Sequence, residues 1–232
     1  MKQLIIMFLL LPLVVFSQAN FEKGQQLYEL GKWEQAQEVF EKILQSEPSN
    51  VKVMEYLGDI AGHRKSWDKA LKYYGKLKTM KPKEADYCFK YGGALGMKAL
   101  EGSRFKALGM IDEVQENFEK AIVLNPKHIE ARWALIELNL QLPAILGGSQ
   151  KKAIQYSNEL AKISAVDGYL SRGHIEEYFK RYTTAEQLYK KAIAAGNSKK
   201  SYQILANLYA NKMNSSDKAK AVLEELKKNN DK

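Results

Sequence analysis

The segment Leu142–Ala153, LPAILGGSQKKA, contains two glycines, a serine and two lysines, residue types that bind phosphate in nucleotide enzymes. A phosphate loop of that kind needs the order G-x-x-x-x-G-K-[ST] between a strand and a helix. Here the serine precedes the lysines, and the residues before the glycines favour a helix. We therefore interpret the segment as a turn between two helices. Leu142 and Pro143 end the first helix, Gly147 and Gly148 supply positive φ angles, and Ser149 caps a helix from Gln150 to Ile163.

Groups suited to catalysis or metal binding are few and scattered. The three histidines are His63, His128 and His174, in different parts of the chain. His174 and Glu177 share a helical face, but two ligands are fewer than a metal site requires. The chain has no G-x-S-x-G motif and no H-E-x-x-H motif. These residues predict no catalytic group, no metal site and no cofactor.

The composition limits which interactions can stabilise the fold and which kinds of partner the chain can bind. Cys88 is the only cysteine, so no disulfide forms within the chain, and we expect a buried, inert thiol. Lys plus Arg number 36 and Asp plus Glu 27, a formal charge of +9. That surplus suits an anionic partner, and it equally suits a solvated surface that binds nothing. A chain of 232 residues has room for one sizeable domain or a short repeat array.

The first residues, MKQLIIMFLLLPLVVFSQA, have the pattern of a secretory signal peptide: Lys2, an apolar run from Leu4 to Phe16, then small and polar residues. The run has 13 residues, whereas a membrane-spanning helix needs about 20. We expect residues 1–17 to be removed, with cleavage after residue 19 as the alternative. The protein is then periplasmic or secreted, with no stable membrane anchor after cleavage.

Two sets of residues are 34 positions apart, and a third set repeats the same pattern further along the chain. An aromatic residue, an alanine, a second aromatic residue, an apolar residue and a helix-ending residue follow one another in fixed order. A glycine precedes each set at a constant offset. The sets are Trp33, Ala36, Phe40, Ile43 and Pro48; Trp67, Ala70, Tyr74, Leu77 and Pro82; and Tyr182, Ala185, Tyr189, Ala192 and Asn197, with the glycines Gly24, Gly58 and Gly173.

Spacings of three and four residues place these side chains on one helical face. The alanine lets a second helix approach closely, and the glycine lies where two helices cross without room for a side chain. Proline or asparagine then stops the second helix. The pattern therefore predicts pairs of packed helices.

This pattern resembles the tetratricopeptide repeat (TPR) family over nearly the whole expected mature chain, and the GGS-type insertion looks like that of exported bacterial TPR proteins. The resemblance implies an all-α fold, a right-handed superhelix of about six helix-turn-helix units whose first helices line a concave face. The expected units lie near residues 18–50, 51–84, 85–126, 127–165, 166–198 and 199–232, and the third and fourth carry insertions.

The insertion in the third unit resembles that in the fourth. Gly102 and Ser103 correspond to Gly148 and Ser149. We expect the first helix of the third unit to end near Glu101 and a long second helix to run from Arg104 to Leu124. Because repeat units stack side by side, both insertions should emerge on one edge and form a candidate site. Its residues are Gly102, Ser103, Gly147, Gly148 and Ser149.

The TPR resemblance also implies which side chains face the groove formed by the first helices. These are Tyr28, Glu55, Asp59, Phe89, Leu135, Leu138, His174, Glu177 and Asn207. The groove is thus expected to be polar at both ends and apolar in the middle. A partner's helix or extended peptide would fill the apolar part. The alternative occupant is the long second helix of the third unit.

We predict a non-enzymatic scaffold that binds a protein or peptide in the cell envelope or outside the cell. The alternative is an envelope protein that binds an anionic polymer through its lysines, and an enzyme is the function that these residues support least. Nucleic acid is not an expected partner, because most aromatic residues occupy repeat positions and exported proteins rarely meet nucleic acid. The sequence specifies neither the partner's identity nor the oligomeric state.

Overall fold

The computed structural model describes residues 18–103 and 107–230, and every regular element in these ranges is helical. The all-α prediction is therefore confirmed. The predicted signal peptide, residues 1–17, lies outside the described residues. Within the described ranges, no helix is long and apolar enough to cross a membrane. The chain divides into an N-terminal unit that ends at Asn117 and a C-terminal unit that begins at Phe118.

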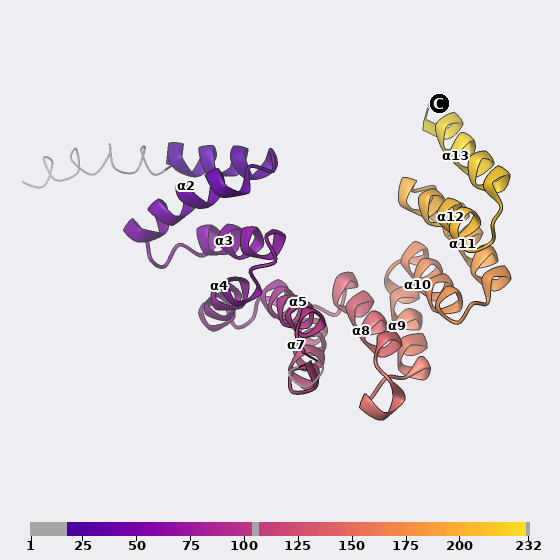
Figure 1. Cartoon of the computed structure of the whole chain (residues 1–232), viewed down its shortest axis with the longest axis horizontal. Helices are drawn as coiled ribbons and strands as arrows, with labels where there is room; N and C mark the ends of the chain where they lie inside the picture. The colour runs from indigo at the N-terminus through magenta and orange to yellow at the C-terminus, as the bar shows by residue number, and fades with distance from the viewer. Residues whose placement is uncertain (1–17, 104–106, 231–232) are drawn as a thin grey trace, which may run out of the picture. The chain divides into compact units, whose positions relative to one another are not determined.

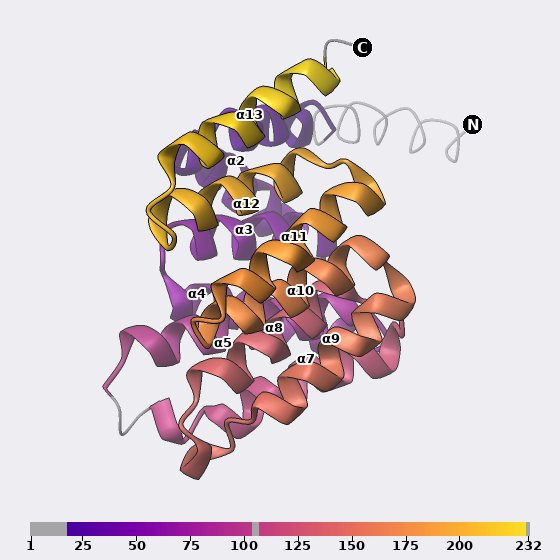
Figure 2. The same cartoon turned by 90° about the vertical axis from the view of Figure 1, so that its right-hand side faces the viewer.

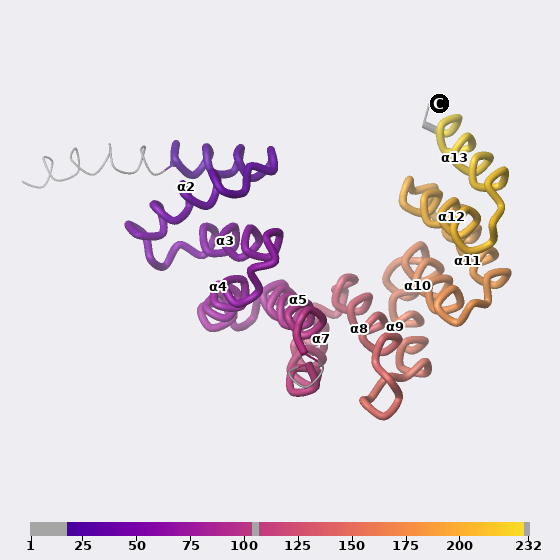
Figure 3. Tube along the Cα trace, in the orientation of Figure 1, coloured from indigo at the N-terminus to yellow at the C-terminus, as the bar shows by residue number. Residues whose placement is uncertain are grey.

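The N-terminal unit is a series of helix-turn-helix pairs in which consecutive helices pack against each other (Figures 1 and 3). The first helix of the first pair covers residues 18–29. The elements that follow are α2 (Trp33–Ser46), α3 (Val51–His63), α4 (Trp67–Met80), α5 (Ala85–Glu101) and the first half of α7 (Ile111–Leu124).

The C-terminal unit continues the same alternation of first and second helices. Figures 1 and 2 show α10 to α13 following one another in chain order. The unit contains the second half of α7, α8 (Ile129–Gln141), the short 3-10 helix η1 (Ala144–Leu146), α9 (Gln150–Ile163), α10 (Ala165–Tyr178), α11 (Tyr182–Gly196), α12 (Lys199–Asn211) and α13 (Ser216–Asn230).

The repeated glycines lie where the two helices of a pair cross, as the sequence predicts. A Cβ atom added to Gly58 of α3 would stand 2.6 Å from a ring carbon of Tyr74 on α4. The corresponding distance is 2.3 Å for Gly173 of α10 and Tyr189 of α11. Both tyrosines are buried. The aromatic ring therefore occupies the space that any side chain larger than hydrogen would need.

The turns inside four pairs share a left-handed residue placed two positions before the second helix. These residues are Gly31, Lys65, Lys180 and Asn214, with φ angles of 70°, 55°, 60° and 50°. Glycine and asparagine adopt such angles readily, whereas for a lysine they cost about 1 kcal/mol or more. The turn thus imposes its geometry even where the local residue disfavours it.

The third pair departs from the sequence-based expectation. Helix α5 ends at Glu101 as predicted, but the long second helix from Arg104 to Leu124 is wrong, because residues 109–110 form a turn and α7 begins at Ile111. Glycine at position 109 is a poor helix former and favours a break there, although the glycines within α5 do not interrupt that helix. Helix α7 has 14 residues, as do α2 and α4. The extra length expected as an alternative occupant of the groove is therefore absent from α7.

The loop after α8 confirms most of the predicted turn. Helix α8 ends at Gln141, Gly147 has a φ of 93°, and the Ser149 hydroxyl accepts a hydrogen bond from the Lys152 amide to cap α9. Gly148 has a different role from the predicted one. A Cβ atom on it would stand 1.8 Å from the carbonyl oxygen of Leu142, so close packing rather than a positive φ requires glycine there.

The two insertions belong to different units, since Gly102 and Ser103 lie in the N-terminal unit and Gly147, Gly148 and Ser149 in the C-terminal one. Their shared edge stays a prediction. Cys88 is buried, with 2% of its surface exposed, as the sequence predicts.

Replacing Gly58 by alanine should destabilise the protein by about 1–3 kcal/mol, because the new methyl group collides with the buried Tyr74 ring. Gly93→Ala in α5 is the matched control, since nothing lies within 4 Å of its added Cβ atom. Alanine there should be neutral or stabilise the helix by about 0.5–1 kcal/mol. Urea unfolding followed by circular dichroism measures both changes. Equal effects of the two substitutions would contradict the crossing argument.

Candidate functional site

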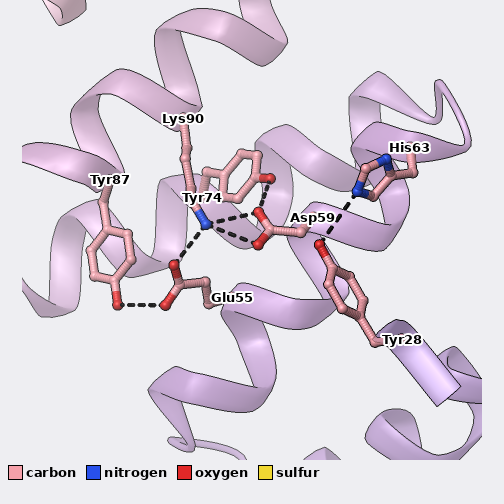
Figure 4. A network of polar contacts seen from close by, with 7 residues as sticks. All are labelled: Tyr28, Glu55, Asp59, His63, Tyr74, Tyr87 and Lys90. Atoms are coloured by element: carbon pink, nitrogen blue, oxygen red, sulfur yellow. Dashed lines mark hydrogen bonds and ion pairs between the residues drawn. The ribbon is translucent and has the colours of Figure 1, made fainter. Parts of the chain in front are cut away.

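Two predicted groove residues of the N-terminal unit, Glu55 and Asp59, form a polar network around Lys90, and a third, Tyr28, lies beside it (Figure 4). Glu55 and Asp59 are four residues apart on α3, so they share one helical face. The Lys90 ammonium on α5 is 2.6 Å from Glu55 Oε1 and 2.9 Å from each carboxylate oxygen of Asp59. One cation thus ties together two successive first helices.

Phenol groups complete this network. Tyr74 donates to Asp59 Oδ1 over 2.6 Å, and Tyr87 donates to Glu55 Oε2 over 3.4 Å. The Tyr28 hydroxyl lies 3.3 Å from Nε2 of His63. Burial and the Glu55 carboxylate raise the pKa of Tyr87 to about 12, and burial together with Asp59 raises the pKa of Tyr74 still further. Both phenols therefore stay protonated as donors.

The surroundings of Lys90 favour its charged form, because they raise its pKa. Burial lowers the pKa of Lys90, but hydrogen bonds and attraction from Glu55 and Asp59 outweigh burial, so the net shift is upward. The predicted groove residues Glu55 and Asp59 therefore already form ion pairs within the chain. The network holds neighbouring helices together. Each of its polar side chains is hydrogen-bonded to another member of the network. Sequence reasoning missed Lys90, although it lies about one repeat length beyond its two partners.

The expected apolar middle of the groove needs one correction. Leu135 is wrong as a groove residue, because none of its surface is exposed. Phe89 and Leu138 are half-buried. Helix α8 carries apolar residues on several sides, WALIELNL, so its sequence alone does not distinguish the side facing the partner helix from the side facing the groove.

In the C-terminal unit, three predicted residues come together at one pocket. His174 and Glu177 of α10 and Asn207 of α12 line a cavity of about 290 Å³. The remaining lining residues come from α8, α10, α11 and α12 and are Trp133, Leu170, Tyr189, Lys200 and Ile204. We call this cavity the C-terminal pocket.

Most polar groups around the C-terminal pocket are already engaged. Tyr189 donates a hydrogen bond of 2.8 Å to Glu177 Oε2, and Trp133 Nε1 donates to Asp167 over 3.1 Å. His174 Nε2 is 2.5 Å from Oε1 of Glu137. Hydrogen bonding to Glu137 raises the pKa of His174 against the effect of burial, and the same bond lowers the pKa of Glu137. Each of the two side chains therefore favours the charged form of the other.

Lys200 differs from the other charged groups of the pocket. Its ammonium lies 5.6 Å from the centre of the Trp133 ring, within range of a cation–π contact. Among the residues that the structure describes, no carboxylate forms an ion pair with it. Sequence reasoning missed Trp133, Lys200 and Ile204.

Part of the N-terminal unit matches a known repeat family by sequence. Residues 21–85 match the family model of the tetratricopeptide repeat. The matched stretch contains the Gly58–Tyr74 crossing and the turn at Lys65. A comparison with curated proteins finds no match.

Solved structures share the TPR fold over most of the chain. A thermophilic TPR protein of Thermus thermophilus has a TM-score of 0.66 and 17% identity, and the match covers 84% of this chain and 99% of that one. YrrB, described as a TPR protein with an unusual peptide-binding site, has a TM-score of 0.51, 15% identity and coverage of 78% and 87%. Human IFIT1, solved as a dimer with m7Gppp-AAAA, has a TM-score of 0.65, 18% identity and coverage of 91% and 54%.

These identities establish a common fold and leave function to the individual sites. Within the described parts of the chain, no group of three or more His, Cys, Asp and Glu side chains could hold a metal ion.

Replacing Lys90 by glutamine should destabilise the stack of helices by about 2 kcal/mol, because Glu55 and Asp59 would be left half-buried without a cation. Lys98→Gln is the matched control on the same helix, since its partner Asp68 is 85% exposed. That change should cost about 0.5 kcal/mol or less. Urea unfolding of both variants tests the difference, and equal losses would show that the network contributes no more than a surface pair.

Proposed function

We propose that this chain is a non-enzymatic TPR scaffold that binds an extended segment of another protein through the C-terminal pocket. One observation carries the proposal: aromatic, aliphatic and polar groups from three first helices converge on a single cavity. A cavity of about 290 Å³ suits one or two side chains of a peptide.

The composition of the pocket is typical of peptide recognition. Trp133 and Ile204 offer apolar contact, and tryptophan is among the residues that contribute most at protein interfaces. The hydrogen bond from Trp133 to Asp167 holds the indole ring in place before a ligand arrives. A pocket ordered in advance binds its partner with a smaller entropy loss.

The fold comparison supports a binding role but does not identify the ligand. YrrB is described as having a peptide-binding site, and IFIT1 was solved with m7Gppp-AAAA, so the fold accommodates both kinds of ligand. We favour a peptide because the pocket presents one exposed cation, whereas nucleic-acid sites follow a charged backbone with several.

The first residues support a place in the cell envelope or outside the cell as part of this proposal. Mass measurement of the protein recovered from its source cells tests it. A chain that begins at Gln18 or Asn20 supports export, and a chain that keeps Met1 contradicts it.

Replacing Asn207 by arginine should abolish peptide binding, because a long charged side chain would fill the pocket from an exposed position. Ala210→Arg is the matched control, since Ala210 is exposed on the same helix but does not line the pocket. The probes are peptides of about ten residues, which are selected from a random phage-displayed library by their binding to the wild-type chain. We expect at least about tenfold weaker binding for the Asn207 variant and less than about twofold change for the control, with circular dichroism confirming that both fold.

Two results would overturn the proposed function. One is that the wild-type chain enriches no peptide. The other is that the selected peptides bind the Asn207 variant as well as they bind the wild type.

A further inference from the structure

The first helices of the C-terminal unit end on one side of it. Trp133 of α8 bonds to Asp167 of α10, and further along both helices Glu137 meets His174, so the two helices run in the same direction. Figure 2 shows the loop between α8 and α9 and the turns α10–α11 and α12–α13 on this side. We call it the turn edge; it comprises residues 142–152, 178–184 and 212–218.

The loop between α8 and α9 presents apolar side chains at the turn edge. Ile145 is 92% exposed, and Leu146 beside it is exposed as well. Backbone hydrogen bonds hold the loop in shape, among them one of 3.0 Å from the Ser149 amide to the Asn139 carbonyl. The loop thus keeps an aliphatic side chain in solvent.

The next turn of the edge adds two exposed aromatic side chains. Tyr178 and Phe179 follow each other at the end of α10, with their ring centres 5.2 Å apart. The Arg181 guanidinium lies 4.9 Å from the centre of the Phe179 ring. Exposed apolar groups therefore occur on two successive turns of the same edge, the second beside a cation.

The turn edge also carries a positive surplus. Lys151 and Lys152 lie in the first turn of α9, and Lys180 precedes α11. Among the residues that the structure describes, none of these three lysines has an ion-pair partner. The first two stretches of the edge contain no acidic residue, and the third adds two lysines and one aspartate.

Two glutamates at the end of α10 offset only part of this surplus. Glu176 contacts both Arg172 and Arg181, so two cations share one carboxylate. Glu177 keeps its negative charge in the C-terminal pocket, where Tyr189 donates a hydrogen bond to it. Even with both glutamates counted as negative, the cations outnumber the carboxylates along the edge.

The second helices of the N-terminal unit begin differently. Helices α2 and α4 carry Glu34 and Asp68 in their first turns, where the positive end of a helix favours an acidic residue. Arg64, in the turn before α4, forms an ion pair with Glu34. Helices α9 and α11 have no acidic residue in their first turns. Their positive helix ends add to the lysines of the turn edge.

We propose that the turn edge binds the surface of an anionic lipid membrane. Ile145 and Leu146 enter the boundary between headgroups and acyl chains, Tyr178 and Phe179 lie at the level of the headgroups, and the lysines meet the anionic lipids. A membrane receives projecting side chains without a matching cavity, whereas a soluble polyanion gives Ile145 no apolar surroundings. This surface uses no residue of the C-terminal pocket, so the proposal goes beyond the proposed function.

Co-sedimentation with lipid vesicles tests the proposal on the chain in the form that its source cells produce. One set of vesicles is phosphatidylcholine, and in the other part of it is replaced by phosphatidylglycerol. We expect the chain to bind the second set more tightly and to lose that preference as salt rises. All variants share the same first residues, so a difference between them arises at the turn edge.

Replacing Lys151 and Lys152 together by glutamine should weaken binding to the anionic vesicles about fivefold for each lysine. The matched control replaces Lys162 and Lys199, which are exposed at the opposite ends of the helices. Lys162 is about 16 Å from Lys151 along α9, beyond the Debye length of about 10 Å at 0.1 M salt. This control should change binding less than about twofold.

Ile145→Asn tests the apolar contact and should weaken binding about fivefold or more. Val123→Asn is its control, since Val123 is 77% exposed on α7, away from the turn edge. A dye sensitive to its surroundings, attached to Ile145→Cys, should brighten and shift to the blue on anionic vesicles, whereas the same dye on Val123→Cys should not. Cys88 is buried and stays unlabelled. Circular dichroism confirms that each variant folds.

Three results would overturn the proposal. One is equal binding to the two kinds of vesicle, and another is an equal loss in the two double-lysine variants. The third is that Ile145→Asn binds as the wild type does and its dye-labelled counterpart shows no shift. If heparin then binds in a manner that depends on Lys151 and Lys152, the partner of the edge is a soluble polyanion instead of a membrane.

Discussion

The contact between a glycine of the first helix and an aromatic ring of the second sets the distance between the helices of a pair. At Gly58 and Tyr74, and again at Gly173 and Tyr189, the ring fills the space that a side chain would take. With that distance fixed, the next first helix packs beside the previous one. Residues one repeat apart, such as Asp59 and Lys90, can then meet across the stack.

The two units use the surfaces of their first helices in different ways. In the N-terminal unit, the single Lys90 ammonium bonds to both Glu55 and Asp59, so these two side chains already have a partner within the chain. In the C-terminal unit, the pairs at His174 and Glu177 leave Lys200 with only an aromatic face. A satisfied network of this kind adds rigidity to the packed helices.

Much of the fold could be predicted because its signals are local. The turn at Gly147 and the cap at Ser149 depend on residues within one turn of each other, and both predictions are confirmed. The helix expected from Arg104 failed where Gly109 and Met110 form a turn inside an otherwise helical pattern. Leu135 failed because apolar residues surround α8, so periodicity did not separate its buried side from its open one.

The sequence by itself determined the repeat, its period and the positions of the crossing glycines, because each depends on spacings along a single helix. It also indicated His174, Glu177 and Asn207 as neighbours on the surface of the first helices. Only the tertiary structure decided which side chains meet one another. That decision depends on side chains of separate helices, such as Glu137 with His174 and Lys200 with Trp133, whose approach follows from packing between repeats rather than from the pattern within one.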